Sequence, residues 1–246
     1  MFLFIKGPNN WNSTNVWVDD NGKLHLKLNY SGRKGGWTCA ELYTNVKFGF
    51  GTFRWFVEGA IDKFDPRVVL GRKGGWTCAE LYTNVKFGFG TFRWFVEGAI
   101  DKFDPRVVLG LFTYGGVDGT NEIDIEVAKW GRTELVASNY FYTVYPHTLG
   151  IAQPVSNGTR ISLQGTYTTH QFTWTSDKVS FLGQHGFMTS PTENIFYSYQ
   201  TPTAFAPSIP YTSAPLHMNL WLFQGKPPMN GQEVEIIVHD FQYTNA

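Results

Sequence analysis

The chain is poor in charge, in cysteine and in long apolar runs, and each absence excludes a class of protein. Charged residues make up 16% of its 246 residues and the formal net charge is zero, whereas soluble domains usually carry about 25% charged residues. The neutral balance argues against a non-specific nucleic-acid binder. Two cysteines exclude a disulfide scaffold and a cysteine-rich zinc module. No apolar run nears the roughly 20 residues of a membrane span, so we expect neither nucleic acid nor membrane as a partner.

Cofactor signatures are also missing, whereas aromatic residues are abundant. The six histidines form no pattern of metal ligands, and there is no redox cofactor motif. We therefore expect catalysis to need no cofactor. Aromatic residues make up 17% of the chain, including nine Trp and 21 Phe.

The length of the chain includes an internal repeat. Residues 32–70 recur letter for letter as residues 71–109. Solenoid repeats diverge and recur at least three times, so two identical copies indicate a recent tandem duplication, an engineered insertion or an assembly error. Without one copy, the chain has 207 residues, which suits one domain. We expect residues 1–246 to form a single domain with one surplus copy.

Apolar residues alternate with polar ones at a period of two in segment after segment. Leu24, Leu26 and Leu28 show this pattern, as do Met218 and Leu220, and glycine, proline, asparagine and aspartate separate the segments. Many short strands of this kind predict an all-β sandwich or jelly roll. Such a fold has room for one copy of the repeated strands. We expect the other copy to be extruded as a surface hairpin or swapped into another chain, giving a monomer or a domain-swapped oligomer.

The motif with the clearest chemistry is the sequence Asn-Glu-Ile-Asp-Ile-Glu-Val at residues 121–127. On a strand, Glu122, Asp124 and Glu126 share one face, and the aliphatic residues between them share the other. A solvated edge strand could tolerate this arrangement. Glycoside hydrolysis, however, requires two carboxyl groups beside the scissile bond, one ionised and one protonated. Repulsion between close carboxylates raises at least one pKa, as a general acid at neutral pH requires.

Neighbouring segments pair an aliphatic face with a face of aromatic and amide side chains. Aromatic rings stack on the apolar faces of sugars, and amides and carboxylates bind hydroxyl groups, so this face fits a polysaccharide cleft. Trp130, just after the acidic motif, is either a stacking platform for a sugar or a packed core residue. The other residues on this face are Phe112, Tyr114, Asn139, Phe141, Asn219 and Trp221.

At these residues the sequence resembles glycoside hydrolase family 16, and its lichenase-like (1,3-1,4-β-glucanase) members in particular. The likeness runs in family order from Trp11 to Tyr243 and includes the Glu-x-Asp-x-Glu motif, Met-Asn-Leu-Trp at 218–221 and His-Asp-Phe-Gln-Tyr at 239–243. It implies a concanavalin A-like β-jelly-roll of two curved antiparallel sheets, with the substrate cleft on the concave sheet. One departure is Tyr82, which stands where lichenase-like members usually carry an arginine.

The resemblance also implies roles for individual residues. Glu122 resembles the nucleophile, Asp124 the assisting carboxylate and Glu126 the general acid/base. Asp240 and the carbonyl of Gly22 resemble a structural calcium site away from the cleft. The positions that match sugar-binding residues of the family are Glu80 (Glu41 in the other copy), Phe112, Tyr114, Asn139, Phe141, Asn219 and Trp221.

These features together predict an endo-acting, retaining hydrolase of 1,3-1,4- or 1,3-β-glucan. Two alternatives remain open: a non-catalytic carbohydrate-binding protein on the same scaffold, and a xyloglucan-type transglycosylase. The family resemblance implies a secreted or extracytoplasmic protein, although no signal peptide is evident in the sequence.

Overall fold

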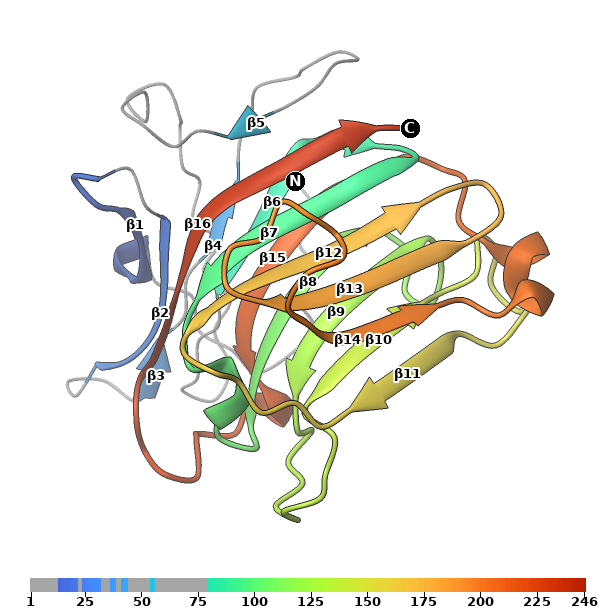
Figure 1. Cartoon of the computed structure of the whole chain (residues 1–246). Helices are drawn as coiled ribbons and strands as arrows, with labels where there is room; N and C mark the ends of the chain where they lie inside the picture. Colours follow the sequence, from blue (N-terminus) through green and yellow to red (C-terminus); the bar gives the residue numbers. More distant parts are fainter. Residues whose placement is uncertain (1–12, 22–23, 32–35, 39–40, 44–53, 56–78) are drawn as a thin grey trace.

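In the computed structural model, two β-sheets pack face to face (Figure 1). The structure describes residues 13–21, 24–31, 36–38, 41–43, 54–55 and 79–246. Helical segments within these ranges are short 3₁₀ turns such as η3 (Ile100–Lys102) and η4 (Thr203–Ser208). None of the helices in the described part is long and apolar enough to cross a membrane.

The first sheet has nine strands. Its main path, in spatial order, is β1 (Val16–Val18), β2 (Leu24–Ser31), β16 (Val234–Asn245), β7 (Gly90–Glu97), β12 (Tyr167–Trp174), β13 (Val179–His185) and β14 (Ile195–Gln200). Two short strands join this path at its sides, β3 (Gly36–Thr38) on β2 and β5 (Arg54–Trp55) on β16.

The second sheet has seven strands and carries the acidic motif. Its spatial order is β11 (Val155–Thr159), β10 (Tyr140–Val144), β9 (Glu122–Ala128), β8 (Val107–Tyr114), β15 (Ala214–Leu222), β6 (Ala79–Phe87) and β4 (Glu41–Tyr43). Apart from β4 on β6, the described pairings of both sheets are antiparallel. The predicted all-β sandwich of two sheets is confirmed.

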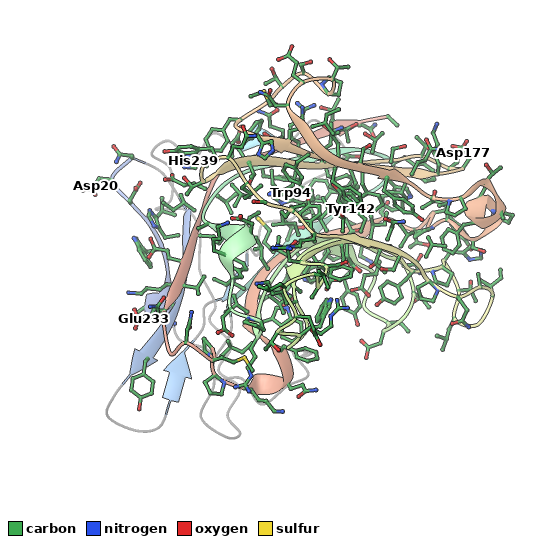
Figure 2. The ribbon with its side chains drawn as sticks, turned by 60° about the horizontal axis from the view of Figure 1, so that its bottom comes forward. Asp20, Trp94, Tyr142, Asp177, Glu233 and His239 are labelled. Atoms are coloured by element: carbon green, nitrogen blue, oxygen red, sulfur yellow. The ribbon has the colours of Figure 1, made fainter. Side chains whose placement is uncertain are left out.

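The core forms between the sheets because every second side chain of each facing strand is apolar. On β7, Phe92, Trp94 and Val96 are fully buried, and Tyr142 of β10, in the other sheet, is buried in the same core. Trp94 and Tyr142 lie in the interior between the two layers (Figure 2). Complete burial of one large apolar side chain contributes about 1.5–3 kcal/mol, so this layer supplies much of the favourable free energy of folding.

The two copies of the repeat occupy different places in the sheets. The second copy supplies β6, β7 and the start of β8, whereas the described parts of the first copy form only the short strands β3, β4 and β5. In β4, Leu42 pairs in parallel with Leu81, the same residue of the other copy. The rest of the first copy lies outside the described residues, so its extrusion or exchange between chains remains a prediction.

A buried polar network on β12 links the two sheets. The Thr168 hydroxyl donates to the Val96 carbonyl, so it accepts a hydrogen bond from His170 Nε2 at 2.9 Å. His170 Nδ1 is then free to accept from the Tyr140 hydroxyl at 2.7 Å. Burial lowers the pKa of His170 from 6.5 to about 3, so the imidazole is neutral in the folded protein near neutral pH.

This network predicts a pH-dependent part of the stability. Between pH 6.5 and about pH 3, the unfolded chain binds a proton at His170 that the folded protein does not. The free energy of unfolding should therefore fall as the pH falls through this window, by about 1.4 kcal/mol per pH unit for one proton. Urea unfolding of the wild type and of His170→Gln should give curves that converge towards pH 3. Parallel curves would show that His170 does not bind this proton on unfolding.

Candidate active site

Strand β9 lies in the middle of the second sheet, between β8 and β10. Ile123, Ile125 and Val127 are almost completely buried in the core. Because side chains alternate along a strand, Glu122, Asp124 and Glu126 are on the opposite face of the sheet. Asp124 is only 4% exposed, and the two glutamates are partly buried. The acidic motif is therefore on a central strand, and a solvated edge strand is excluded.

Two residues with positive φ bracket this strand. Asn121 (φ 49°) precedes Glu122, and Trp130 (φ 54°) follows the end of β9. Positive φ is uncommon for residues other than glycine. Asn121 is held in this conformation because its backbone N–H donates to the Pro146 carbonyl and its side-chain amide donates to the His147 carbonyl. These contacts fix where the strand begins and therefore which face Glu122 occupies.

Strand pairing places each carboxyl group in a row of side chains that crosses the sheet. The row of Asp124 contains Thr143 on one side and, on the other side, Phe112, His217 and Tyr82. The row of Glu126 contains Phe141 on one side and, on the other side, Gly110, Asn219 and Glu80. Tyr114 lies opposite Glu122. The structure thus brings Glu80, Phe112, Tyr114, Phe141 and Asn219 to the same face as the three carboxyl groups.

The glycine in the row of Glu126 makes room for the side chain of Asn219, which lies over it. A Cβ atom on Gly110 would lie 2.5 Å from Asn219 Oδ1, a separation that real atoms do not adopt. Asn219 Oδ1 is buried and has no hydrogen-bond partner among the described residues. An unpaired buried acceptor is costly unless something donates to it, so this oxygen suits a hydroxyl donor from a ligand.

Burial and mutual repulsion shift the acidity of the three carboxyl groups in the same direction. Burial, followed by the charge of Glu126, raises the pKa of Glu122 to about 8, although a hydrogen bond with Asp124 opposes the rise. Burial and the charges of both glutamates raise the pKa of Asp124 well above its usual value. Burial raises the pKa of Glu126 to about 7. The interaction between Asp124 and Glu122 raises the pKa of Asp124 and lowers that of Glu122, so it favours the proton on Asp124 and the charge on Glu122.

Two tyrosines and an aspartate complete the surroundings of Glu122. The Tyr114 hydroxyl donates to Asp118 Oδ1 at 2.7 Å. Burial raises the pKa of Tyr145, and the charges of all three motif carboxyl groups raise it further, which places Tyr145 beside them. The sequence analysis missed Tyr145 and Asp118. Tyr145 continues the alternation with a period of two that includes Phe141, and this pattern could have indicated it. Asp118 is in a loop that has no such period.

An aromatic cluster lies at the other end of β9. Trp130 is 6.2 Å from Phe141, 6.1 Å from Trp221 and 5.6 Å from Phe223, measured between ring centroids. The Arg132 guanidinium lies over the Phe141 ring, 5.7 Å from its centroid. The structure thus brings the predicted residues Trp130, Phe141 and Trp221 together, and it adds Phe223, which the sequence analysis missed.

Asn139 does not fit the predicted sugar-binding role. It is 4% exposed, and its amide group donates to the carbonyls of Asp101 and Ile161. Its Oδ1 accepts from the backbone N–H of Ile161 at 2.7 Å. Every polar atom of the side chain is therefore committed to the backbone, and Asn139 connects β10 to the loop after β11 and to η3.

The expected calcium ligands can be examined only in part. Gly22 lies outside the described residues. Asp240 Oδ2 accepts a hydrogen bond from the Gln242 amide at 2.8 Å. Calcium takes six to eight oxygen ligands, and no group of three or more acidic, histidine or cysteine side chains gathers within the described ranges. These residues do not form a calcium site by themselves, and the site remains a prediction.

No protein-family model and no curated protein matches the chain, but solved structures do. A β-glucanase of Bacillus licheniformis is 18% identical with a TM-score of 0.57, and the match covers 98% of this chain and 86% of that one. A family 16 protein from a mixed-linkage glucan locus of Bacteroides ovatus, solved with a bound product, is 12% identical with a TM-score of 0.57. The match covers 97% of this chain and 89% of that one. The chain has the fold of the glycoside hydrolase family 16 β-glucanases.

The same fold also occurs in a protein described as a pseudo-glucanase. A pseudo β-1,3-glucanase of Mycobacterium tuberculosis is 15% identical with a TM-score of 0.57, and the match covers 97% of this chain and 82% of that one. The expected jelly roll is confirmed by these matches, and the function has to be argued from the residues of the site.

The raised pKa of Glu122 predicts a stability change that can be measured without a substrate. Between pH 4.5 and about pH 8, the folded protein keeps a proton at Glu122 that the unfolded chain loses. The free energy of unfolding should therefore fall as the pH rises through this window. Glu122→Gln cannot ionise, so it should gain a few kcal/mol relative to the wild type between pH 5 and pH 8.5.

The matched control for this measurement is Glu134→Gln, because Glu134 is exposed on the loop after β9. Urea unfolding at the two pH values should give the same wild-type-to-variant difference for Glu134→Gln. If the difference in the free energy of unfolding between the wild type and Glu122→Gln were also the same at both pH values, the Glu122 carboxyl would not be desolvated in the folded protein.

Proposed function

We propose that the protein is an endo-acting, retaining β-glucan hydrolase of 1,3-1,4- or 1,3-linked chains. The observation that carries the proposal is the set of three carboxyl groups on β9, buried on one sheet face with raised pKa values, those of Glu122 and Glu126 being about 8 and about 7. General acid catalysis at neutral pH requires a carboxyl group that is still protonated there. Glu126, with a pKa of about 7, meets this requirement.

In the proposed reaction, the reactive form has Glu122 ionised and Glu126 protonated, which is a minor part of the population near neutral pH because the coupled pKa values are about 8 and about 7. The Glu122 carboxylate of this form attacks the anomeric carbon, and the bond to the leaving sugar breaks. Glu126 donates its proton to the departing glycosidic oxygen. The glycosyl ester on Glu122 is then hydrolysed by water, whose proton passes to Glu126 as its oxygen attacks the anomeric carbon. Two inversions give net retention of configuration. Asp124 holds Glu122 in place and keeps its negative charge stable through their hydrogen bond.

The neighbours of the carboxyl groups support a polymeric sugar as the substrate. Asn219 and Glu80 lie on one side of β9 and Phe141 lies on the other, whereas Trp130 lies at the end of β9, 6.2 Å from Phe141 and 6.1 Å from Trp221. Sugar-binding groups on both sides of the reacting bond allow a chain to be bound in its middle, as endo action requires. Aromatic rings can stack on the apolar faces of glucose units, and the amide and carboxylate oxygens can accept from hydroxyl groups.

The charge of the site supports an uncharged glucan. Glu80, Asp118 and the three motif carboxyl groups all lie at this face, and the charges of Glu80 and Asp118 reach Glu122 strongly enough to raise its pKa. A cationic side chain nearby, Arg132, lies over the Phe141 ring. An anionic polysaccharide would therefore meet an unfavourable electrostatic potential at this face of the sheet.

A second candidate function is carbohydrate binding without catalysis. One structural neighbour is a pseudo β-1,3-glucanase, so the fold alone permits this outcome. The presence of all three motif carboxyl groups in this chain favours catalysis, and the measurements below separate the two functions.

The catalytic roles predict different behaviour for the two glutamates. Glu122→Gln should lower reducing-end release from lichenan or laminarin by about three orders of magnitude or more, because the nucleophile is lost. Glu126→Ala should lose activity on the polymer but retain the first step on an aryl β-glucoside oligomer, whose leaving group needs no proton. Glu134→Gln should cleave as fast as the wild type. A wild type that binds the polymer but releases no reducing ends would establish the non-catalytic alternative.

The acidic face predicts discrimination against charged substrates. At low ionic strength, carboxymethylated glucan should be cleaved with a kcat/KM about tenfold or more below that of the parent glucan, because like charges repel. The gap should narrow at 0.5 M salt, at which the Debye length is only a few ångströms. Equal rates for both polymers at low salt would contradict the proposed preference for uncharged chains.

A further inference from the structure

His217 on β15 is a basic residue in contact with Glu80, which belongs to the row of Glu126. Its Nδ1 lies 2.7 Å from Glu80 Oε1 on the neighbouring strand β6. An ionised carboxylate can only accept hydrogen bonds, so Nδ1 carries the proton of this contact. The side chains of His217 and Glu80 are 9% and 13% exposed, which makes the contact nearly dry and stronger than a surface pair.

The imidazole ring is also fixed from both sides. It stacks on Tyr82 with centroids 5.2 Å apart and an interplanar angle of 18°, and on Phe112 at 5.0 Å and 23°. Tyr114 meets the ring edge-on at 5.7 Å. The stack crosses β6, β15 and β8, because Tyr82, His217 and Phe112 are direct partners in the pairing of these strands. With its ring held in this way, His217 has one orientation in which to meet Glu80.

The contact leaves Glu80 as a fixed acceptor. Oε1 is the oxygen in contact with His217, so a further donor would meet Oε2. Glu80 pairs with Asn219 across β6 and β15, and the Asn219 Oδ1 atom is buried without a partner in the described part of the chain. The two acceptor oxygens therefore belong to neighbouring positions of one row, next to Gly110 and Glu126.

We propose that His217 is a positioning residue that holds Glu80 by Oε1 so that its other oxygen, Oε2, accepts from a hydroxyl group of the bound glucan. This inference rests on the proposed function for its substrate, and it adds a specificity-determining residue on the β6 side of the carboxyl groups. A sugar with a hydroxyl group at this place binds to an acceptor that is already oriented, whereas a mobile Glu80 would have to be ordered on binding.

Two variants separate the hydrogen bond from the ring stack. His217→Phe keeps an aromatic ring between Tyr82 and Phe112 but has no donor for Glu80. His217→Asn loses the ring but can place an amide N–H near the position of Nδ1. If the hydrogen bond positions Glu80, His217→Phe should raise KM about tenfold with kcat changed less than twofold. His217→Asn should recover most of the lost affinity. A KM near the wild-type value for His217→Phe, together with a raised KM for His217→Asn, would overturn the proposal in favour of a packing role.

A double-mutant cycle shows whether His217 acts through Glu80. Glu80→Ala should raise KM at least as much as His217→Phe does. Adding His217→Phe to Glu80→Ala should then change KM by less than twofold, because the group that His217 orients is already gone. Additive effects would mean that His217 affects the substrate by another route and would contradict the proposal.

Binding measurements keep this inference separable from the proposed function. Calorimetric titration of a mixed-linkage tetrasaccharide into Glu122→Gln, with and without His217→Phe, should show about tenfold weaker binding in the double variant. If the wild type cleaves no glucan but this difference appears, the proposed hydrolysis is wrong and the role of His217 stands. If the wild type cleaves glucan and neither KM nor this affinity depends on residue 217, the inference is wrong and the proposed function stands.

A spectroscopic measurement on otherwise unchanged protein covers the case in which His217→Phe does not fold. In protein labelled with ¹⁵N-histidine, Nδ1 of His217 should give the signal of a protonated ring nitrogen. This signal should shift when Glu80 is replaced by alanine and again when the tetrasaccharide binds to Glu122→Gln. A His217 signal that neither change moves would overturn the proposal.

Discussion

The arrangement of the site depends on the burial of one face of β9. Ile123, Ile125 and Val127 are fixed in the core at 0–1% exposure, and a strand cannot turn its other face away without withdrawing them. The three carboxyl groups are therefore held in line and close together despite their repulsion. The apolar face supplies the free energy that offsets this repulsion. The resulting desolvation raises the pKa values into the range that acid catalysis requires.

The neighbouring strands adjust this face by what they place opposite each carboxyl group. Phe112 lies opposite Asp124 and excludes water from it, whereas Gly110 lies opposite Glu126 and makes room for the side chain of Asn219. An aromatic ring and a missing side chain thus have complementary effects, one electrostatic and one steric. His217 extends the arrangement to the next strand, because its stack on Phe112 continues the row and its Nδ1 reaches Glu80.

Much of this face could be predicted from the spacing of residues along the sequence, because alternation alone assigns Glu122, Asp124 and Glu126 to one side of a strand. The same rule fails for Asn139, whose spacing from Phe141 is correct but whose amide is satisfied by the backbone of Asp101 and Ile161. It also cannot reveal the contact between His217 and Glu80, since that contact depends on the pairing of strands 137 residues apart. Alternation describes one strand, whereas contacts between rows require the order and register of the whole sheet.

The repeated segment shows the same limit in its strongest form, because identical residues take different positions. Glu41–Tyr43 forms a three-residue edge strand, whereas the same letters in the second copy belong to the nine-residue strand β6, which pairs with β15 over most of its length. No local propensity can separate two identical segments, so the difference comes from their partners in the sheets. The surplus residues lie between β2 and β6, which are both close to an edge of their sheets. Because the entropic cost of closing a connection rises only slowly with its length, an insertion between these two strands leaves the central order of β8, β9 and β10 undisturbed. The face that carries Glu122, Asp124 and Glu126 can therefore persist beside this insertion.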